Sequence, residues 1–502
     1  MKRGGRATIF VGFRENCSAW GIINTMKRWL LFLCAGMLSV PLTAYELPDL
    51  GDSSSMTLSS KDEMALGRQV MQEIRADPAY FNDPESVDFV SSVGHRLLAV
   101  SDDLGDQHHF EFFILEDPTL NAFALPGGFI GVHTALIEAA DNESELASVL
   151  AHEISHVTQH HIARAMEDQN KNLPLSLAAM AAAILAARSS PDGAMGGVVG
   201  AQAGMVQAQL NFSRSNEREA DRLGIRRLLK TDYDPRAMAT FFTKLGRYGR
   251  FYEGAPAFLQ THPLTTERLA EIQDRLQNVP YRQVQDGPDF ALIKARIQAL
   301  VGTPHEALES FQNHDYDIHR PEEVPLIYGK AVALWRNRDY GEAQSLLEQV
   351  RAVSPPNALF DSLRAQITLD SGHVHQAILQ FQHGLQRFPD ERALNYGYIT
   401  ALLTAGLPEQ ALKVINERVA LTSSDERLYE FQSQAYAALN QQMMSHEALA
   451  QAYLLLDNPS AAMDQLQIAL GAGDGDFYQK SQVEATMREI KAELAARKGK
   501  KK

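Results

Sequence analysis

The chain has 502 residues, of which 45% are hydrophobic and 22% are charged, as in ordinary folded globular proteins. This length exceeds what one hydrophobic core usually organises, so we expect two or three domains. The formal net charge of −15 argues against a phosphate-binding surface, and we expect no nucleic-acid partner.

The N-terminal region, residues 1–44, has the features of an export signal. Lys27 and Arg28 precede an apolar run from Trp29 to Val40, and Leu42-Thr43-Ala44 forms a small-residue cleavage site. The apolar run is too short to span a bilayer. We therefore predict a signal peptide that is cleaved after Ala44.

The predicted translation start and the positions of the cysteines are consistent with an exported protein. The residues before Met26 do not resemble a signal, so we predict that translation starts at Met26. Cys17 and Cys34 are the only cysteines, and both precede the predicted cleavage point. A mature chain without thiols can occupy an oxidising compartment without any disulfide. With the export signal, this favours the bacterial periplasm.

The first strand signals follow helical patterns that begin near Lys61. Phe110–Leu115 is typical of a strand. The apolar runs Asn121–Leu125 and Phe129–Val132 flank the turn Pro126-Gly127-Gly128, which predicts a β-hairpin.

The next helix, predicted to start at Asp141–Glu145, carries a metal-binding pattern. Residues 151–161 read AHEISHVTQHH. His152 and His156 are four residues apart, so on a helix they share one face and can bind one ion, for which Zn²⁺ is suited. Glu153 lies one step around the helix, where it can act on metal-bound water as a general base.

A third protein ligand must come from another segment. Ile162 stands where one class of metallopeptidase has a third histidine, and this excludes that class. His160 follows His156 by one turn, but three ligands along a straight helix cannot converge, because the outer two are about 12 Å apart. We therefore expect His160 and His161 at the surface or beside the ligands.

A later helix, predicted to start near Asn216, supplies suitable carboxylates. It contains Glu217-Arg218-Glu219-Ala220-Asp221, in which Glu217 and Asp221 share a face. Glu217 can ligate the metal, while Asp221 can hold a ligating histidine or assist proton transfer. We expect Glu219 to be an ordinary surface charge.

Between these two helices, residues 173–187 form an apolar run. It is too short to span a bilayer unaided. We interpret it as a buried helix or one half of a helical hairpin, with peripheral membrane contact as the alternative.

His262 is a candidate regulatory fourth ligand. Pro263 disfavours helical backbone at His262, which predicts a loop–helix junction. Catalytic zinc keeps one position open, and a histidine that fills it would hold an enzyme latent. The alternative role for His262 is helix capping or core packing.

The C-terminal part has a repeat. Ala343, Ala377 and Ala411 recur at intervals of 34 residues, and Pro355 and Pro389 keep the same spacing. This helix–turn–helix period is typical of tetratricopeptide repeats. After Ser423 we expect the register to slip.

The predicted fold is therefore mainly α. We expect an α-helical metallopeptidase domain with a small β-sheet over residues 46–280. A tetratricopeptide α-solenoid would follow over residues 286–490, with a basic tail at 491–502.

The motifs HEISH, EREAD and NAFALPGGFI together resemble those of the gluzincin metallopeptidases related to the CAAX prenyl protease and the membrane protease HtpX. Those relatives span membranes. The combination with an export signal and repeats is instead similar to the periplasmic proteases that enhance β-barrel assembly, over nearly all of the mature chain. The resemblance implies one zinc ion bound by His152, His156 and Glu217, with Glu153 as catalytic acid/base and Asp221 as supporting proton donor.

The resemblance also implies a function in quality control. Such an enzyme promotes maturation of outer-membrane β-barrel proteins, degrades unfolded or stalled ones, and contacts the β-barrel assembly machinery through its repeats. A competing hypothesis is a non-catalytic scaffold or chaperone with a structural metal. The intact Glu153 argues against it, because a structural site needs no base.

Overall fold

The computed structural model describes residues 59–105, 109–169, 214–251, 256–280, 284, 287–312 and 316–499. All of them lie within one compact unit, Ser53–Lys502. The predicted export signal and the apolar run at 173–187 are outside the described residues and stay predictions. Within the described ranges, no helix is both long enough and apolar enough to cross a membrane.

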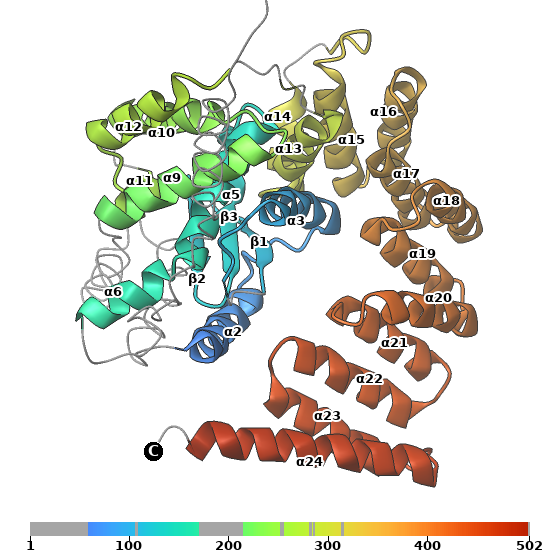
Figure 1. Ribbon diagram of the computed structural model, residues 1–502. Helices are drawn as coiled ribbons and strands as arrows, with labels where there is room; N and C mark the ends of the chain where they lie inside the picture. The colour runs from blue at the N-terminus through green and yellow to red at the C-terminus, as the bar shows by residue number, and fades with distance from the viewer. Residues whose placement is uncertain are drawn as a thin grey trace, which may run out of the picture. The chain divides into compact units, whose positions relative to one another are not determined.

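A small sheet lies beside the helices that carry the sequence motifs. It consists of β1 (Glu111–Leu115), β2 (Ala122–Leu125) and β3 (Phe129–His133) in the order β1-β3-β2. Strand β3 pairs in parallel with β1 and antiparallel with β2. Gly127 and Gly128 join β2 to β3 with φ of 80° and 90°, a region that glycine adopts readily. The predicted strand and hairpin are confirmed, and β2 is an edge of the sheet (Figure 1).

The N-terminal helices, coloured blue to green in Figure 1, include α2, α3 and α5, which pack on this sheet. They are α2 (Ser60–Ala76), α3 (Pro84–Ala99), α4 (Thr134–Ala139), α5 (Glu143–Thr158), α6 (His161–Gln169), α9 (Arg214–Lys230), α10 (Ala237–Phe251), α11 (Ala257–Thr261) and α12 (Thr266–Leu276).

Helix α5 is the central helix of this part. Its start is fixed by Asn142, whose side chain accepts a hydrogen bond from the backbone N–H of Glu145. Every residue of α5 is buried, because it packs on β2, β3, α3, α9 and α10. Polar side chains on such a helix must find partners inside the protein.

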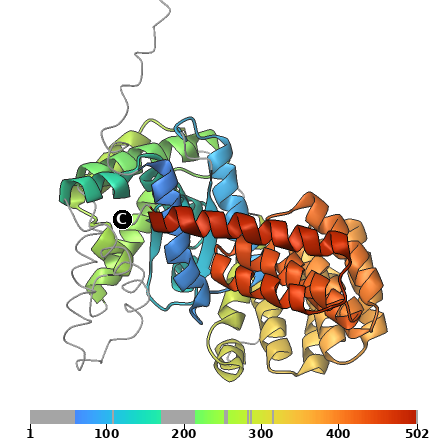
Figure 2. The same cartoon turned by 90° about the horizontal axis from the view of Figure 1, so that it is seen from below.

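The C-terminal helices stack one after another, from yellow to red in Figures 1 and 2. They are α13 (Pro288–Leu300), α14 (Pro304–Gln312), α15 (Val324–Arg336), α16 (Tyr340–Val353), α17 (Ala358–Asp370), α18 (Val374–Arg387), α19 (Arg392–Thr404), α20 (Pro408–Leu421), α21 (Glu426–Ala438), α22 (Gln442–Leu455), α23 (Pro459–Gly471) and α24 (Phe477–Gly499). Each contacts its neighbours in the chain, as expected for a repeat solenoid.

The repeat period continues farther than the sequence indicated. Helices α15, α17, α19 and α21 begin at Val324, Ala358, Arg392 and Glu426, each 34 residues after the one before. The expectation that the register slips after Ser423 is therefore wrong for α21 and α22. Among the described C-terminal helices, the nine-residue α14 and the 23-residue α24 depart clearly from the lengths of the others.

A polar substitution explains why this repeat was missed. Ser445 takes the position that Ala343, Ala377 and Ala411 hold in the earlier repeats, one period beyond the last of them. It is buried, and its Oγ lies 3.0 Å from both the hydroxyl and the carbonyl oxygen of Ser433. Its small size preserves the close helix crossing, while its hydroxyl is satisfied locally.

Helix α3 links the sheet-bearing part to the repeats. Arg296 of α13 lies 2.7 Å from Asp83, and Arg392 of α19 lies 2.7 Å from Asp88. The two parts thus meet through ion pairs and through apolar contacts, such as that between Phe89 of α3 and Phe290 of α13. Whether they are separable domains divided near residues 280–286 stays a prediction.

Candidate metal centre

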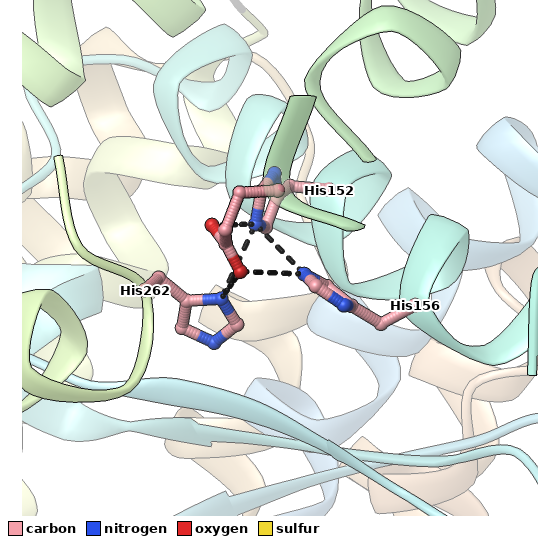
Figure 3. Close-up of side chains that lie close together, drawn as sticks. His152, His156 and His262 are labelled. Atoms are coloured by element: carbon pink, nitrogen blue, oxygen red, sulfur yellow. Dashed lines mark hydrogen bonds and ion pairs between the residues drawn. The ribbon is translucent and has the colours of Figure 1, made fainter. Parts of the chain in front are cut away.

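Two histidines of helix α5 point toward each other (Figure 3). His152 and His156 are both fully buried, and their Nε2 atoms are 3.0 Å apart. Their four-residue spacing places them on one face of the helix. Two nitrogen lone pairs at this distance repel unless a proton or a metal ion lies between them.

Glu217 reaches the same point from helix α9. Its Oε1 is 3.4 Å from His156 Nε2, and its Oε2 is 3.5 Å from His152 Nε2. Helix α9 can approach α5 this closely because Gly224 has no side chain. A Cβ there would lie 3.3 Å from the backbone nitrogen of His152.

His262 completes the cluster. It follows the short helix α11 and is 1% exposed, at the predicted loop–helix junction. Its Nδ1 lies 3.0 Å from Glu217 Oε1 and 3.4 Å from His152 Nε2. The structure therefore brings together all four residues that the sequence singled out as metal ligands.

The spacing of these four donors fits a tetrahedral metal ion. One ligand atom from each residue lies within 4.8 Å of all the others. Ligands of a tetrahedral ion with bonds of about 2.0–2.1 Å are about 3.3–3.4 Å apart. Three contacts lie close to that value, at 3.4–3.5 Å: His152 with Glu217, His156 with Glu217, and His152 with His262. Two others are shorter, at 3.0 Å: His152 with His156, and Glu217 with His262.

Glu153 borders the cluster without joining it. The side chain is fully buried, and its Oε1 is 3.6 Å from His262 Nε2. Burial raises the pKa of its carboxyl, against the attraction of His262 and His152. A buried carboxyl beside the ligands, with a raised pKa, suits proton transfer.

Asp221 and Arg268 form an outer layer behind the ligands. Asp221 Oδ1 lies 3.0 Å from His152 Nδ1, so the carboxylate holds the ring by its outer nitrogen. Arg268 donates two hydrogen bonds of 2.8 Å to Asp221 and places its third nitrogen 2.6 Å from Glu217 Oε2. Arg268 is 2% exposed. Sequence reasoning missed it, although three acidic residues near one metal site already implied a buried cation.

Burial and neighbouring carboxylates shift the pKa values of the ligand histidines in opposite directions. Burial lowers the pKa of His152, but the carboxylates of Asp221 and Glu217 outweigh it and raise that pKa to about 9. Burial dominates at His156 and holds its pKa well below the usual value. Without a metal, the cluster thus retains a proton on His152. Metal binding would release that proton.

The remaining polar residues of the motifs lie beside the ligands. His161 is buried, with Nδ1 2.9 Å from His156 Nδ1. His160 lies outside the cluster and contacts Glu63 at 3.1 Å. The expectation that Glu219 is only a surface charge is wrong, because its carboxylate lies 3.2 Å from His161 Nε2. The contact depends on how the chain turns after α5, which spacing along a helix does not show.

Comparison with known proteins gives one family match. The profile of peptidase family M48 matches residues 88–276, which include the four candidate ligands.

Individual relatives extend the similarity over most of the chain. The β-barrel assembly-enhancing protease of Escherichia coli K12 is 33% identical over 450 residues, which are 89% of this chain and 92% of the relative. The protein of the same name from Yersinia pestis is 35% identical over 393 residues, covering 78% and 80%. The mitochondrial metalloendopeptidase of Schizosaccharomyces pombe is 32% identical over 215 residues, covering 42% and 58%.

Proposed function

Because the chain belongs to peptidase family M48, we propose that it is a zinc-dependent endopeptidase acting on unfolded polypeptides. The observation that carries the proposal is the buried cluster of His152, His156 and Glu217 beside Glu153. Imidazole and carboxylate donors in tetrahedral spacing are typical of zinc.

The roles we propose for the side chains follow from their positions. Zinc held by His152, His156 and Glu217 would supply a Lewis acid and lower the pKa of water at its open position. Glu153 would take a proton from the attacking water and pass it to the leaving amine nitrogen. Asp221 faces His152 and Arg268, which supports the role of holding a ligand rather than that of proton donor.

The edge strand β2 suggests how a substrate is held. It packs beside α5, and the backbone of Ala124 lowers the pKa of the Glu153 carboxyl, against the larger effect of burial. An extended chain that pairs with β2 would pass close to that base. Main-chain pairing selects little for sequence, which suits an enzyme that removes unfolded proteins.

We further propose that the enzyme acts in the periplasm on outer-membrane β-barrel proteins. The relatives named β-barrel assembly-enhancing protease match most of the chain, and the predicted export signal supports the location. Unfolded or stalled β-barrel proteins would be the substrates. The repeats would contact the assembly machinery, because solenoids offer extended surfaces for partner chains.

A test of the zinc site uses Glu217→Ala. We expect zinc content to fall from about one ion per chain to a small fraction, because a carboxylate ligand is lost. Cleavage of an unfolded outer-membrane protein should fall with it. The control is Glu267→Ala on α12, whose side chain is 67% exposed. Normal zinc content and normal cleavage in Glu217→Ala would refute the proposed site.

We also propose that His262 keeps the enzyme latent by filling the fourth position. His262→Ala should then raise proteolysis at unchanged zinc content and melting temperature. The gain would be at least about twofold if half or more of the molecules are latent. Proteolysis of an unfolded substrate, measured beside metal analysis and thermal melting, checks this. Reduced activity together with a lower melting temperature would instead indicate a structural role.

A further inference from the structure

The metal ligand His156 has a partner on the nitrogen that faces away from the cluster. Its Nδ1 lies 2.9 Å from Nδ1 of His161, and the two rings meet edge to face with centroids 4.9 Å apart. His161 is fully buried. A ligating histidine usually donates its outer N–H to a carboxylate or carbonyl oxygen, so a second imidazole in this place needs an explanation.

A sharp turn brings His161 into this position. Helix α5 ends at Thr158, and α6 begins at His161. Between them, His160 has φ of 50°, a left-handed conformation that non-glycine residues adopt infrequently. The carboxylate of Glu63, 3.1 Å from its ring, supports the turn. The turn ends the straight helix and directs His161 back toward His156.

The far side of His161 contacts a carboxylate. Its Nε2 lies 3.2 Å from Oε2 of Glu219, on the same helix as the ligand Glu217. Arg164 donates to that oxygen at 3.2 Å, which favours the ionised carboxylate. The Glu219 side chain is 28% exposed, so the chain of contacts runs from the buried ligand to the surface.

The direction of each hydrogen bond follows from what each group can do. An ionised carboxylate only accepts, so Nε2 of His161 must carry a hydrogen and donate it to Glu219. Beside a metal dication, a second positive charge on buried His161 is unfavourable, so its Nδ1 is a bare acceptor. Nδ1 of His156 must then donate. That leaves the lone pair of His156 on Nε2, the atom that faces the cluster.

We propose that His161 and Glu219 are positioning residues that fix the tautomer of His156 and so present its Nε2 lone pair to the metal. The proposal rests on the zinc site proposed above and deepens it. Its measurable consequence is zinc affinity, because a ligand free to take the wrong tautomer must first give up a proton from the binding nitrogen.

Two substitutions at His161 separate this role from simple packing. His161→Phe keeps a ring but offers no acceptor, and we expect zinc affinity to fall about 10–100-fold. His161→Asn can place its amide oxygen where Nδ1 was and accept from His156, so most of the affinity should return. Dissociation constants come from competition with a chromophoric chelator, and melting temperatures are taken on the metal-free proteins.

Glu219→Met provides a second route, because it removes the acceptor at a partly exposed site and leaves the buried ring in place. We expect a loss of about tenfold in zinc affinity, at the lower end of the usual range. Glu267→Met is the matched control, since it makes the same change at a side chain of α12 that is 67% exposed. It should bind zinc like the wild type.

The proposal is overturned if His161→Phe binds zinc as tightly as the wild type, or if His161→Asn loses as much as His161→Phe. Should His161→Phe not fold, Glu219→Met decides, and unchanged affinity there overturns the proposal. If Glu217→Ala also leaves zinc affinity unchanged, then the proposed zinc site itself has failed, which is a different outcome.

Discussion

Glu153→Gln should lower the rate of peptide cleavage by about 10²–10⁴-fold while leaving the metal content unchanged. Glutamine has nearly the same shape but cannot take up the proton of the attacking water. The side chain lies at the edge of the ligand cluster, with Oε1 3.6 Å from His262 Nε2, and is not one of the four candidate ligands, so we expect metal binding to be retained. Because burial raises the pKa of Glu153, the neutral amide should not destabilise the fold.

The experiment measures cleavage of an unfolded β-barrel protein beside metal analysis of the same samples. Glu145→Gln is the matched control on helix α5, about 12 Å from Glu153 along the helix axis. It removes a carboxylate that pairs with Lys244 at 2.7 Å but does not touch the metal ligands. Wild-type cleavage by Glu153→Gln would remove this residue from the mechanism.

Arg268→Met should be the most destabilising of the substitutions considered. Arg268 is buried and pairs with both Asp221 and Glu217, so its removal leaves two carboxylates without their cation. Breaking a buried ion pair from one side costs about 3–5 kcal/mol of unfolding free energy. We expect the loss to be larger in metal-free protein, because a bound metal would still neutralise Glu217.

Thermal and denaturant unfolding, with and without a chelator, would check this prediction. The control is Arg275→Met on the same helix α12, since Arg275 is exposed and pairs with Glu271 one turn away. That change should alter the unfolding free energy by about 0.5 kcal/mol or less. Arg268→Lys should recover only part of the loss, because lysine cannot make the paired hydrogen bonds to Asp221. Equal stabilities of Arg268→Met and Arg275→Met would contradict the proposed role.

The sequence predicted those features that depend on local spacing. The positions of His152 and His156 follow from one helical turn, and the hairpin follows from two glycines between apolar runs. Glu217 could be selected because it shares a helix face with Asp221. In each case, residues close in the chain determine the geometry.

Other features depend on contacts between distant segments and were not predicted. Arg268 acquires its role only when α12 packs against α9, which no local pattern indicates. His161 was judged on a helix assumed to run straight, but α5 stops at Thr158 and the chain turns at His160. In the repeats, Ser445 stands where the earlier units have alanine. The sequence pattern therefore did not indicate that the 34-residue period continues there.

The ion pairs of helix α3 also impose an order on folding. Each repeat helix meets its neighbours within a few tens of residues, whereas Asp83 and Arg296 are 213 residues apart in the chain. The repeats can therefore form from their N-terminal end as synthesis proceeds, while docking on α3 requires closure of a long loop and comes late. Until then α3 presents Asp83 and Asp88, which water solvates well. An undocked chain would also leave apolar surface open on α3, because Phe89 packs against Phe290 of α13 in the folded protein.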